Sequence, residues 1–401
     1  MNSLGDGRQP EPGSGLESLA QLRSALNSVM ALDGHTSLDD GTYEFRGRLV
    51  VESSEAFDHI YDRFTSAGYT PMLFRRNGQE VVVARRGVVK LRPLNPRVNL
   101  VLFILTILST LFAGMLYGAS PEVERALARS GGDPFSVIFS NPALLLNGLP
   151  YMLALLGILG VHEMGHYVLG RIHKADVTPP YFIPMPIGLG TMGAVILLRS
   201  PIKNKRQLFD IGVAGPLAGL VIAIPLMIIG LATSPVMSDE QARLLFGLGP
   251  GAALPREGNS ILYLLLKLLV HGRILPGGGF DVMLNAIAFP AWIGLFITSL
   301  NLLPIGSLDG GHVTYALFGR QQWRIARVAW LIMLGGGLFL LLTRFDLGLN
   351  VWLLWALLVQ LFGVMHPPPL DDITPLDPRR RALGIFALIL FLILIVPIPF
   401  S

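Results

Sequence analysis

The chain has 401 residues, of which 52% are hydrophobic and only 14% are charged, whereas about 25% of the residues of a typical soluble domain are charged. It contains no cysteine, which excludes disulfides, cysteine-ligated metals and a thiol nucleophile. The net charge of +4 is small and sits at loop ends, which suits membrane orientation rather than nucleic-acid binding. Long apolar runs begin after Arg97, so we expect a polytopic α-helical membrane protein with a small N-terminal soluble part.

The N-terminal part is expected to comprise two pieces. Residues 1–40 should be disordered, or partly helical where leucines recur at helical spacing. Residues 41–97 should form a small α/β domain of the order β-α-β-β, closed by a hairpin whose turn is Asn77-Gly78, a dipeptide that favours a type I′ turn. This domain contains no cluster of catalytic residue types, so a regulatory or interaction role is expected for it.

Residues 98–401 are expected to form a transmembrane domain, because a span needs about 20 apolar residues. About six or seven transmembrane helices are predicted. The candidate spans are 98–118, 142–169, 208–232, 282–303, 326–342, 349–364 and 383–400. The segment from Pro184 to Leu198 is too short to span, and it could form either a re-entrant β segment or a loop resting on the membrane.

Basic residues in short loops indicate the orientation. Five of them precede the first span, which predicts a cytoplasmic N-terminus; they are Arg85, Arg86, Lys90, Arg92 and Arg97. The first thirty residues show neither a secretory signal pattern nor the composition of a transit peptide. A bacterial inner membrane is therefore the expected location, with a plastid membrane as the alternative.

The chemistry is predicted at the end of the second span, which reads His162-Glu163-Met164-Gly165-His166. On a helix the two histidines lie one turn apart on the same face, so both imidazoles can reach one metal ion. Glu163 is offset around the helix, which suits a general base better than a ligand. A buried polar cluster without metal is the alternative, but ionisable residues within a span are expensive and mark functional sites.

A catalytic zinc usually takes three protein ligands, so a third ligand is needed. Asp309 is the best candidate, because the second and fourth spans run in the same direction and Asp309 follows the inner end of the fourth. Gly310 and Gly311 remove side chains beside it and allow close backbone approach. A simple turn is the alternative for this Asp-Gly-Gly sequence taken alone.

The two motifs together resemble the site-2 protease family of intramembrane zinc metalloproteases. The family pattern is matched by the His162–His166 motif, by residues 301–311 and by Ala214-Gly215-Pro216-Leu217-Ala218-Gly219. Residues 179–184 and the prolines near position 367 place it nearest the cyanobacterial and chloroplast (EGY-like) branch. The resemblance covers the chain from about Val98 onward.

This resemblance implies one Zn²⁺ per chain, cleavage of transmembrane protein substrates, and a substrate contact at Asn301. Zinc would activate a water molecule and Glu163 would take its proton. The segment containing Gly190 and Gly193 could pair with an unwound substrate by strand addition. The rival functions are a transporter and a zinc-binding membrane chaperone or scaffold that does not cut. The substrate's identity, the substrate gate and the oligomeric state do not follow from the sequence.

Overall fold

In the computed structural model, the chain divides into two compact units. The smaller unit contains residues 1–92, 200–206 and 368–376, and the larger unit contains the rest. The structure describes residues 14–38, 41–89, 95–118, 120–245, 247, 249, 254, 256–344 and 350–400. The expected disorder of residues 1–13 therefore lies outside the described residues.

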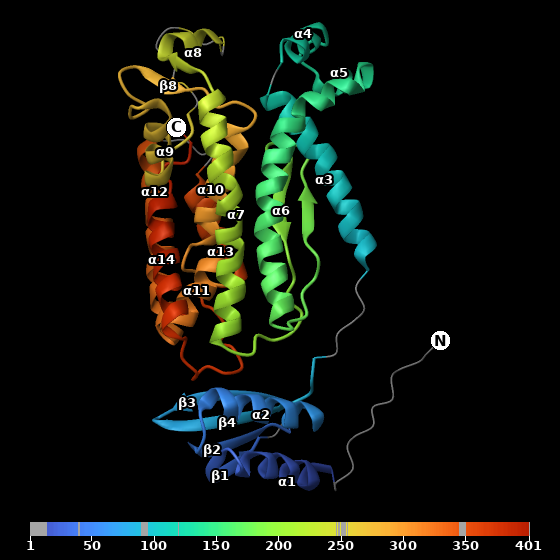
Figure 1. The fold of residues 1–401 in the computed structure, drawn as a ribbon, viewed down its shortest axis with the longest axis vertical. Coiled ribbons are helices and arrows are strands. Elements are labelled where there is room, and N and C mark those ends of the chain that lie inside the picture. Colours follow the sequence, from blue (N-terminus) through green and yellow to red (C-terminus); the bar gives the residue numbers. More distant parts are fainter. Residues whose placement is uncertain are drawn as a thin grey trace. The chain divides into compact units, whose positions relative to one another are not determined.

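The smaller unit is a four-stranded antiparallel sheet with two helices (Figure 1). Its elements are α1 (Ser14–Asn27), β1 (Met30–Ser37), β2 (Tyr43–Leu49), α2 (Ser53–Ser66), β3 (Tyr69–Arg76) and β4 (Gln79–Arg86). The strand order is β1-β2-β4-β3. Buried and partly buried residues alternate along the first six residues of β3. The buried face of β3 packs against the buried side of α2, including Phe57 and Phe64, in one core.

The β-α-β-β order of β2, α2, β3 and β4 is the one expected from the sequence, and Asn77-Gly78 does form the turn, with φ of 51° and 83°. Strand β1 was not predicted, because its residues after Met30 are nearly all exposed and give no hydrophobic alternation. Pairing with β2, in a register from Met30–Leu49 to Ser37–Tyr43, holds it in place.

Two later segments of the chain join the smaller unit, which the sequence did not indicate. Residue 73 of β3 donates its N–H to the Leu370 carbonyl at 2.7 Å, and its own carbonyl accepts the N–H of Asp372 at 2.9 Å. The Leu370 N–H in turn reaches the Ile202 carbonyl at 3.0 Å. Backbone pairing of this kind extends the sheet beyond β3.

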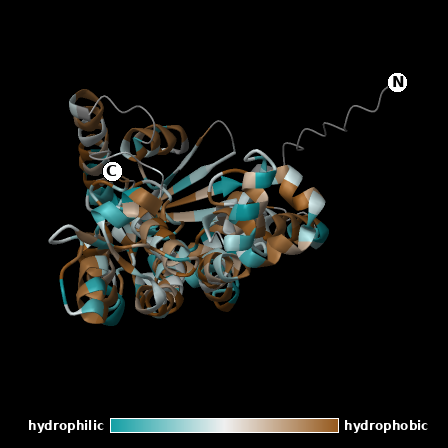
Figure 2. Cartoon of the chain, turned by 90° about the horizontal axis from the view of Figure 1, so that it is seen from above, coloured by the Kyte–Doolittle hydropathy of each residue, from teal (hydrophilic) through white to brown (hydrophobic). Residues whose placement is uncertain are grey.

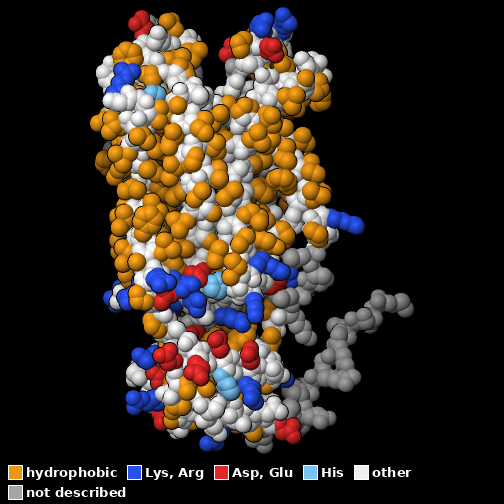
Figure 3. Space-filling model, in the orientation of Figure 1, with side chains coloured by type: hydrophobic (Ala, Val, Ile, Leu, Met, Phe, Trp, Pro, Cys, Tyr) orange, Lys and Arg blue, Asp and Glu red, His pale blue; other side chains and the backbone are white. Residues whose placement is uncertain are grey.

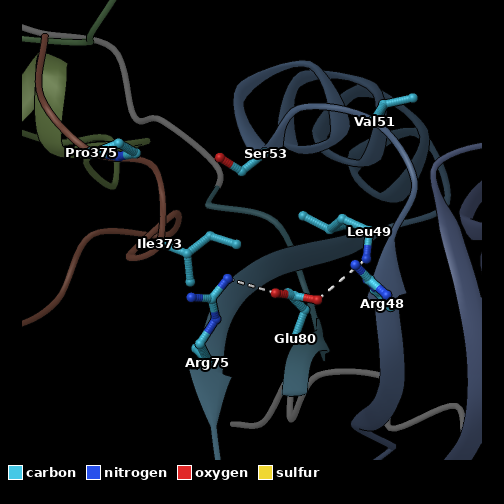
Figure 4. Close-up of a pocket in the computed structure, with 8 residues that line it drawn as sticks. All are labelled: Arg48, Leu49, Val51, Ser53, Arg75, Glu80, Ile373 and Pro375. Carbon is cyan, nitrogen blue, oxygen red and sulfur yellow. Dashed lines mark hydrogen bonds and ion pairs between the residues drawn. The ribbon is translucent and has the colours of Figure 1, made fainter. Parts of the chain in front are cut away.

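A hollow of about 420 Å³ opens in the smaller unit (Figure 4). It is lined by Arg48, Leu49, Val51, Ser53, Arg75, Glu80, Ile373 and Pro375. Glu80 is the only carboxylate in this lining, and it already binds the Arg75 guanidinium at 2.7 Å and the Leu49 N–H at 3.3 Å. The lining therefore offers no set of metal ligands.

The larger unit is mainly helical (Figure 1). Its principal helices are α3 (Pro96–Tyr117), α6 (Leu149–Ile172), α7 (Lys205–Thr233, from Gln207 onward), α10 (Ala288–Asn301), α11 (Asp309–Phe318), α12 (Gln322–Arg344), α13 (Val351–Phe362) and α14 (Pro378–Leu394). Shorter elements are α4 (Pro121–Arg129), α5 (Pro134–Ser140), α8 (Asp239–Leu245), α9 (Ile261–His271), the 3₁₀ turns η1 (Pro142–Gly148) and η2 (Gly319–Gln321), and the strand pair β7 (Val236–Ser238) and β8 (Phe280–Val282).

Among the described residues, four helical stretches are long and apolar enough to cross a membrane: Pro96–Tyr117, Pro142–Ile172, Lys205–Thr233 and Asp309–Thr343. The first three match predicted spans. The span expected at 282–303 is shorter in the structure, because Phe280–Val282 pairs with β7 and α10 begins only at Ala288. The span expected at 383–400 ends as a helix at Leu394, before two prolines that cannot continue it. The total of six or seven spans stays a prediction.

Apolar side chains cover the outside of the larger unit, as in a protein surrounded by lipid. A broad band of hydrophobic residues covers the face drawn in Figure 3, and the helices are mostly hydrophobic in Figure 2. On α3 the exposed apolar residues include Val98, Leu100, Val101, Ile104, Leu105 and Leu108. A soluble monomer rarely exposes an apolar surface of this extent.

A β-hairpin lies beside α3 and α6 (Figure 1). It consists of β5 (Tyr181–Pro184) and β6 (Thr191–Val195), which pair antiparallel. The segment Pro184–Leu198 therefore contains β structure, which was one of its two predicted conformations. The first strand of the hairpin begins three residues before this segment, at Tyr181. Polar groups of the helices fix the hairpin: Asn99 donates to the Pro179 and Pro180 carbonyls at 2.9 and 3.0 Å, and Ser109 donates to the Gly190 carbonyl at 2.6 Å.

A buried ion cluster ties α9 to the segments on either side of it. Lys267 is fully buried, and its Nζ lies 3.3 Å from Glu257 and 3.1 Å from Asp281. The Tyr263 hydroxyl also donates to Glu257, at 2.8 Å. Removing a buried cation leaves two carboxylates without a counter-charge, which costs far more than losing an exposed pair.

We therefore expect Lys267→Met to lower the free energy of unfolding by about 3 kcal/mol. Arg256→Ala removes the partly exposed Arg256–Asp239 ion pair and should lower the free energy of unfolding by less than about 1 kcal/mol. Thermal unfolding of the two variants in detergent measures the difference. Equal losses of Tm would contradict a structural role for the buried cluster.

Candidate metal centre

The two histidines of the predicted motif lie on α6, and both are buried. Their Nε2 atoms are 3.2 Å apart, as expected for side chains one turn apart on the same face. Close packing brings α10 against this helix: a Cβ on Gly294 of α10 would lie 2.9 Å from the side chain of Ile158. α10 therefore ends next to the histidine pair.

Asp309 is the first residue of α11, after a tight loop that contains Gly306. Gly306 has a φ of 53°, which L side chains rarely adopt. A Cβ on Gly310 would lie 1.9 Å from the Leu302 carbonyl oxygen, and one on Gly311 would lie 2.2 Å from the Gly306 carbonyl oxygen. The expected close backbone approach is thus present, and it aims the carboxylate at α6.

The three side chains meet at distances that suit one metal ion. Asp309 Oδ2 lies 3.3 Å from His162 Nε2, and Asp309 Oδ1 lies 3.3 Å from His166 Nε2. Two ligands at 2.0–2.1 Å from a tetrahedral ion are about 3.3 Å apart. The Nε2–Nε2 separation of 3.2 Å matches an edge of such a tetrahedron, and each imidazole has a carboxylate oxygen of Asp309 at 3.3 Å.

The hydrogen bond on the far side of His166 supports the same conclusion. His166 Nδ1 lies 2.7 Å from the Ile211 carbonyl oxygen of α7. A carbonyl can only accept, so Nδ1 carries the proton, and in the neutral ring Nε2 presents a lone pair. That lone pair faces a carboxylate oxygen, which also only accepts. A metal ion between them resolves this conflict, as would a second proton on the ring, and the Ile211 carbonyl orients the ring as in known metal sites.

Glycines on α7 make room for the imidazoles. A Cβ on Gly215 would lie 2.0 Å from His166 Nε2, and one on Gly219 would lie 3.3 Å from His162 Nδ1. The small-xxx-small spacing of Gly215 and Gly219 is typical of close helix packing. In the structure the groups that pack against these two glycines are the histidine side chains.

Glu163 is buried beside the histidines, where it contacts the hairpin. The backbone of Ile196, the residue after β6, donates a hydrogen bond to its carboxylate. Glu163 is not part of the group of close ligand atoms, which consists of His162, His166 and Asp309 with all separations within 4.8 Å. Glu163 thus lies outside the group of possible ligands, and its role as general base stays a prediction.

The predicted substrate-contact residues fall in three different settings. Asn301, at the end of α10, places its Nδ2 3.3 Å from His162 Nε2, within the centre. Gly190 packs against α3, where a Cβ would lie 2.6 Å from the Ser109 carbonyl oxygen. A Cβ on Gly193 would meet nothing within 4 Å, so its side of β6 is open. The substrate role of all three stays a prediction.

The comparisons with known proteins agree with this geometry. The model of peptidase family M50 matches residues 150–343, which contain both motifs. The chain is 29% identical over 311 residues to "Probable zinc metalloprotease EGY1, chloroplastic" of Arabidopsis thaliana, covering 75% of this chain and 53% of that protein. It is 31% identical over 266 residues to the EGY2 protein of the same plant, covering 66% and 44%.

Over residues 150–343 the chain is similar to peptidase family M50. The resemblance to site-2 proteases of the EGY-like branch is thereby confirmed. The chain spans about half the length of the curated relatives it matches.

Two further histidines form a pair near the centre. His312, one turn after Asp309, places Nδ1 2.6 Å from His366 Nε2. This separation is a hydrogen bond and is too short for two ligands of one tetrahedral ion, which need about 3.3 Å. The sequence gave no indication of the pair, because its members are 54 residues apart.

We expect Gly215→Ala to lower the metal content of the purified protein about tenfold, because the added methyl group would occupy the position of His166 Nε2. Metal analysis of the variant measures this. Gly157→Ala on α6 is the matched control, since its Cβ would meet nothing within 4 Å. Normal metal content in Gly215→Ala would show that the histidine pair does not hold the ion.

Proposed function

We propose that the protein is an intramembrane zinc metallopeptidase that hydrolyses peptide bonds of transmembrane proteins. His162, His166 and Asp309 would hold one Zn²⁺, and Glu163 would serve as general base. The observation that carries the proposal is the convergence of two imidazoles and a carboxylate, whose possible ligand atoms lie within 4.8 Å of one another, beside the buried Glu163 on a membrane-length helix.

The donor set supports zinc as the metal. Two imidazole nitrogens and one carboxylate oxygen, with room for a further ligand, are typical of catalytic zinc sites. The two similar Arabidopsis proteins are also named as probable zinc metalloproteases. When bound, zinc would polarise the scissile carbonyl and acidify water at the site.

Each of the protein's own groups has a definite task in the proposed hydrolysis. Glu163 takes a proton from the attacking water and returns it to the leaving amine nitrogen as the C–N bond breaks. The Ile196 N–H holds the Glu163 carboxylate in position. Asn301, 3.3 Å from His162, is close enough to contact a substrate carbonyl at the centre.

A peptide bond inside a helix is shielded, so the substrate must unwind before cleavage. Within the described residues β6 pairs only with β5, which leaves the backbone of its other edge open to strand addition. Because Ile196, next to β6, binds Glu163, a substrate strand on this edge would run close to the base. The open side of Gly193 allows backbone to approach there.

The same proposal includes the finer topology. We propose six or seven spans, in which α10, α13 and α14 cross together with the four longer stretches. The N-terminus would be cytoplasmic, and a bacterial inner membrane or a plastid membrane would house the protein. We also propose the division into residues 1–40, a cytoplasmic domain over 41–97 and a protease domain over 98–401. Positive residues before α3 and after α6 support this orientation.

Glu163→Gln tests the chemistry directly. The variant should retain one zinc per chain and lose at least about 1000-fold in the rate of substrate cleavage, because an amide cannot accept the proton. Asp309→Ala should lose both zinc and cleavage. Turnover by Glu163→Gln at the wild-type rate would exclude Glu163 as the base.

The edge of β6 is tested by photo-crosslinking. A crosslinker at Met192 or Val195, which are 71% and 44% exposed, should capture a transmembrane substrate bound to Glu163→Gln. The same group at Leu244 of α8, which is 75% exposed, should not. Equal capture at all three positions would argue against substrate binding by strand addition.

A further inference from the structure

Asp210, on the second turn of α7, is bound by side chains from two other helices. Its Oδ1 and Oδ2 accept hydrogen bonds from Nε and Nη2 of Arg380 on α14, both at 2.7 Å. His173, the C-cap residue of α6, places Nε2 2.8 Å from Asp210 Oδ2. The His173 side chain is partly buried, with 20% of its surface exposed. A two-pronged guanidinium–carboxylate pair fixes both position and orientation.

The guanidinium is itself held at its third nitrogen. Arg380 Nη1 lies 2.6 Å from Oδ2 of Asp377, and Asp377 caps the first turn of α14. All three nitrogens of Arg380 therefore have carboxylate partners. Asp210 of α7 thus connects α6, through His173, with α14, through Arg380. These contacts form a rigid junction of three helices.

The junction is adjacent to the group that orients His166. Residue 211, whose carbonyl binds His166 Nδ1 at 2.7 Å, follows Asp210 directly. On α6, His166 and His173 are seven residues apart, which is about two turns. Asp210 and Ile211 of α7 thus contact His173 and His166 of α6, respectively. Arg380 fixes the position of Asp210 in the first of these contacts.

A small movement of α7 would break the contact with His166. Backbone atoms lie about 2.3 Å from a helix axis, so a rotation of about 30° shifts them by about 1.2 Å. A shift of this size away from the ring would lengthen the 2.7 Å contact beyond hydrogen-bond range. It would also turn Gly215 away from the ring, although only glycine leaves room for His166 Nε2 there.

We propose that Asp210 is a positioning residue for the metal centre: held by Arg380 and His173, it keeps the Ile211 carbonyl on His166 Nδ1 and so sets the affinity for zinc. This inference rests on the proposed function, because it takes His166 as a zinc ligand. Groups that orient a ligating histidine typically contribute a factor of about 10–100 in metal affinity.

The test compares zinc affinities of the full-length protein in detergent by competition with a chelator. Asp210→Asn should weaken binding about 10–100-fold, and Arg380→Lys, which keeps the charge but loses the two-pronged geometry, should weaken it less. Arg381→Ala is the matched control, because its side chain is exposed on the same turn of α14. Thermal unfolding of the metal-free proteins separates a loss of affinity from a loss of folding.

A second readout needs neither metal nor activity. In protein labelled at histidine with ¹⁵N, the hydrogen-bonded Nδ1–H resonance of His166 should move upfield or exchange faster in Asp210→Asn. Zinc affinity within twofold of wild type, with an unchanged resonance, would overturn the inference. If His166→Ala also left zinc binding unchanged, the proposed metal centre itself would have failed, and the two failures are thereby distinguished.

Discussion

Two imidazoles and a carboxylate converge within 3.3 Å of one another in a buried part of a membrane-length helix bundle. Lone pairs gathered in this way repel one another unless a cation lies between them, and ionisable groups within a span are costly without a partner. Much of the surrounding backbone is arranged to make this convergence sterically feasible. Gly215 and Gly219 give the rings room, and Gly310 and Gly311 let the Asp309 loop fold on itself.

The larger unit combines this centre with a backbone edge next to it. The hairpin of β5 and β6 is anchored through Asn99 and Ser109 of α3 and through Tyr151 of α6, whose hydroxyl donates to the Leu189 carbonyl at 3.1 Å. Its far end binds Glu163 through Ile196. Helices therefore fix the hairpin on one side while one edge of β6 has no strand partner among the described residues. The proposed metal ligands, base and substrate edge are therefore held by helices and by a paired strand.

The sequence predicted the parts whose signal is local. The histidine pair follows from helical period, the β-α-β-β order from alternation and the Asn77-Gly78 turn, and Asp309 from the need for a third ligand at matching depth. It could not predict contacts between residues distant in sequence. The Ile211 carbonyl bears no side-chain signature, and His173 and Asp210, which pair in the structure, are 37 residues apart in the sequence. Strand β1 has exposed residues and is held by pairing rather than by its own pattern. The span near 282–303 looked longer because apolar residues before Ala288 are not helical.

X-ray absorption at the zinc K-edge, on wild-type protein carrying one equivalent of zinc, tests directly whether His162, His166 and Asp309 bind one zinc ion. We expect two imidazole nitrogens and one carboxylate oxygen at about 2.0–2.2 Å from the zinc in a four-coordinate site. In His162→Ala the spectrum should lose the contribution of one imidazole, because another ligand takes its coordination position or the metal is released. A spectrum without imidazole scattering, or one unchanged by His162→Ala, would contradict the shared metal centre.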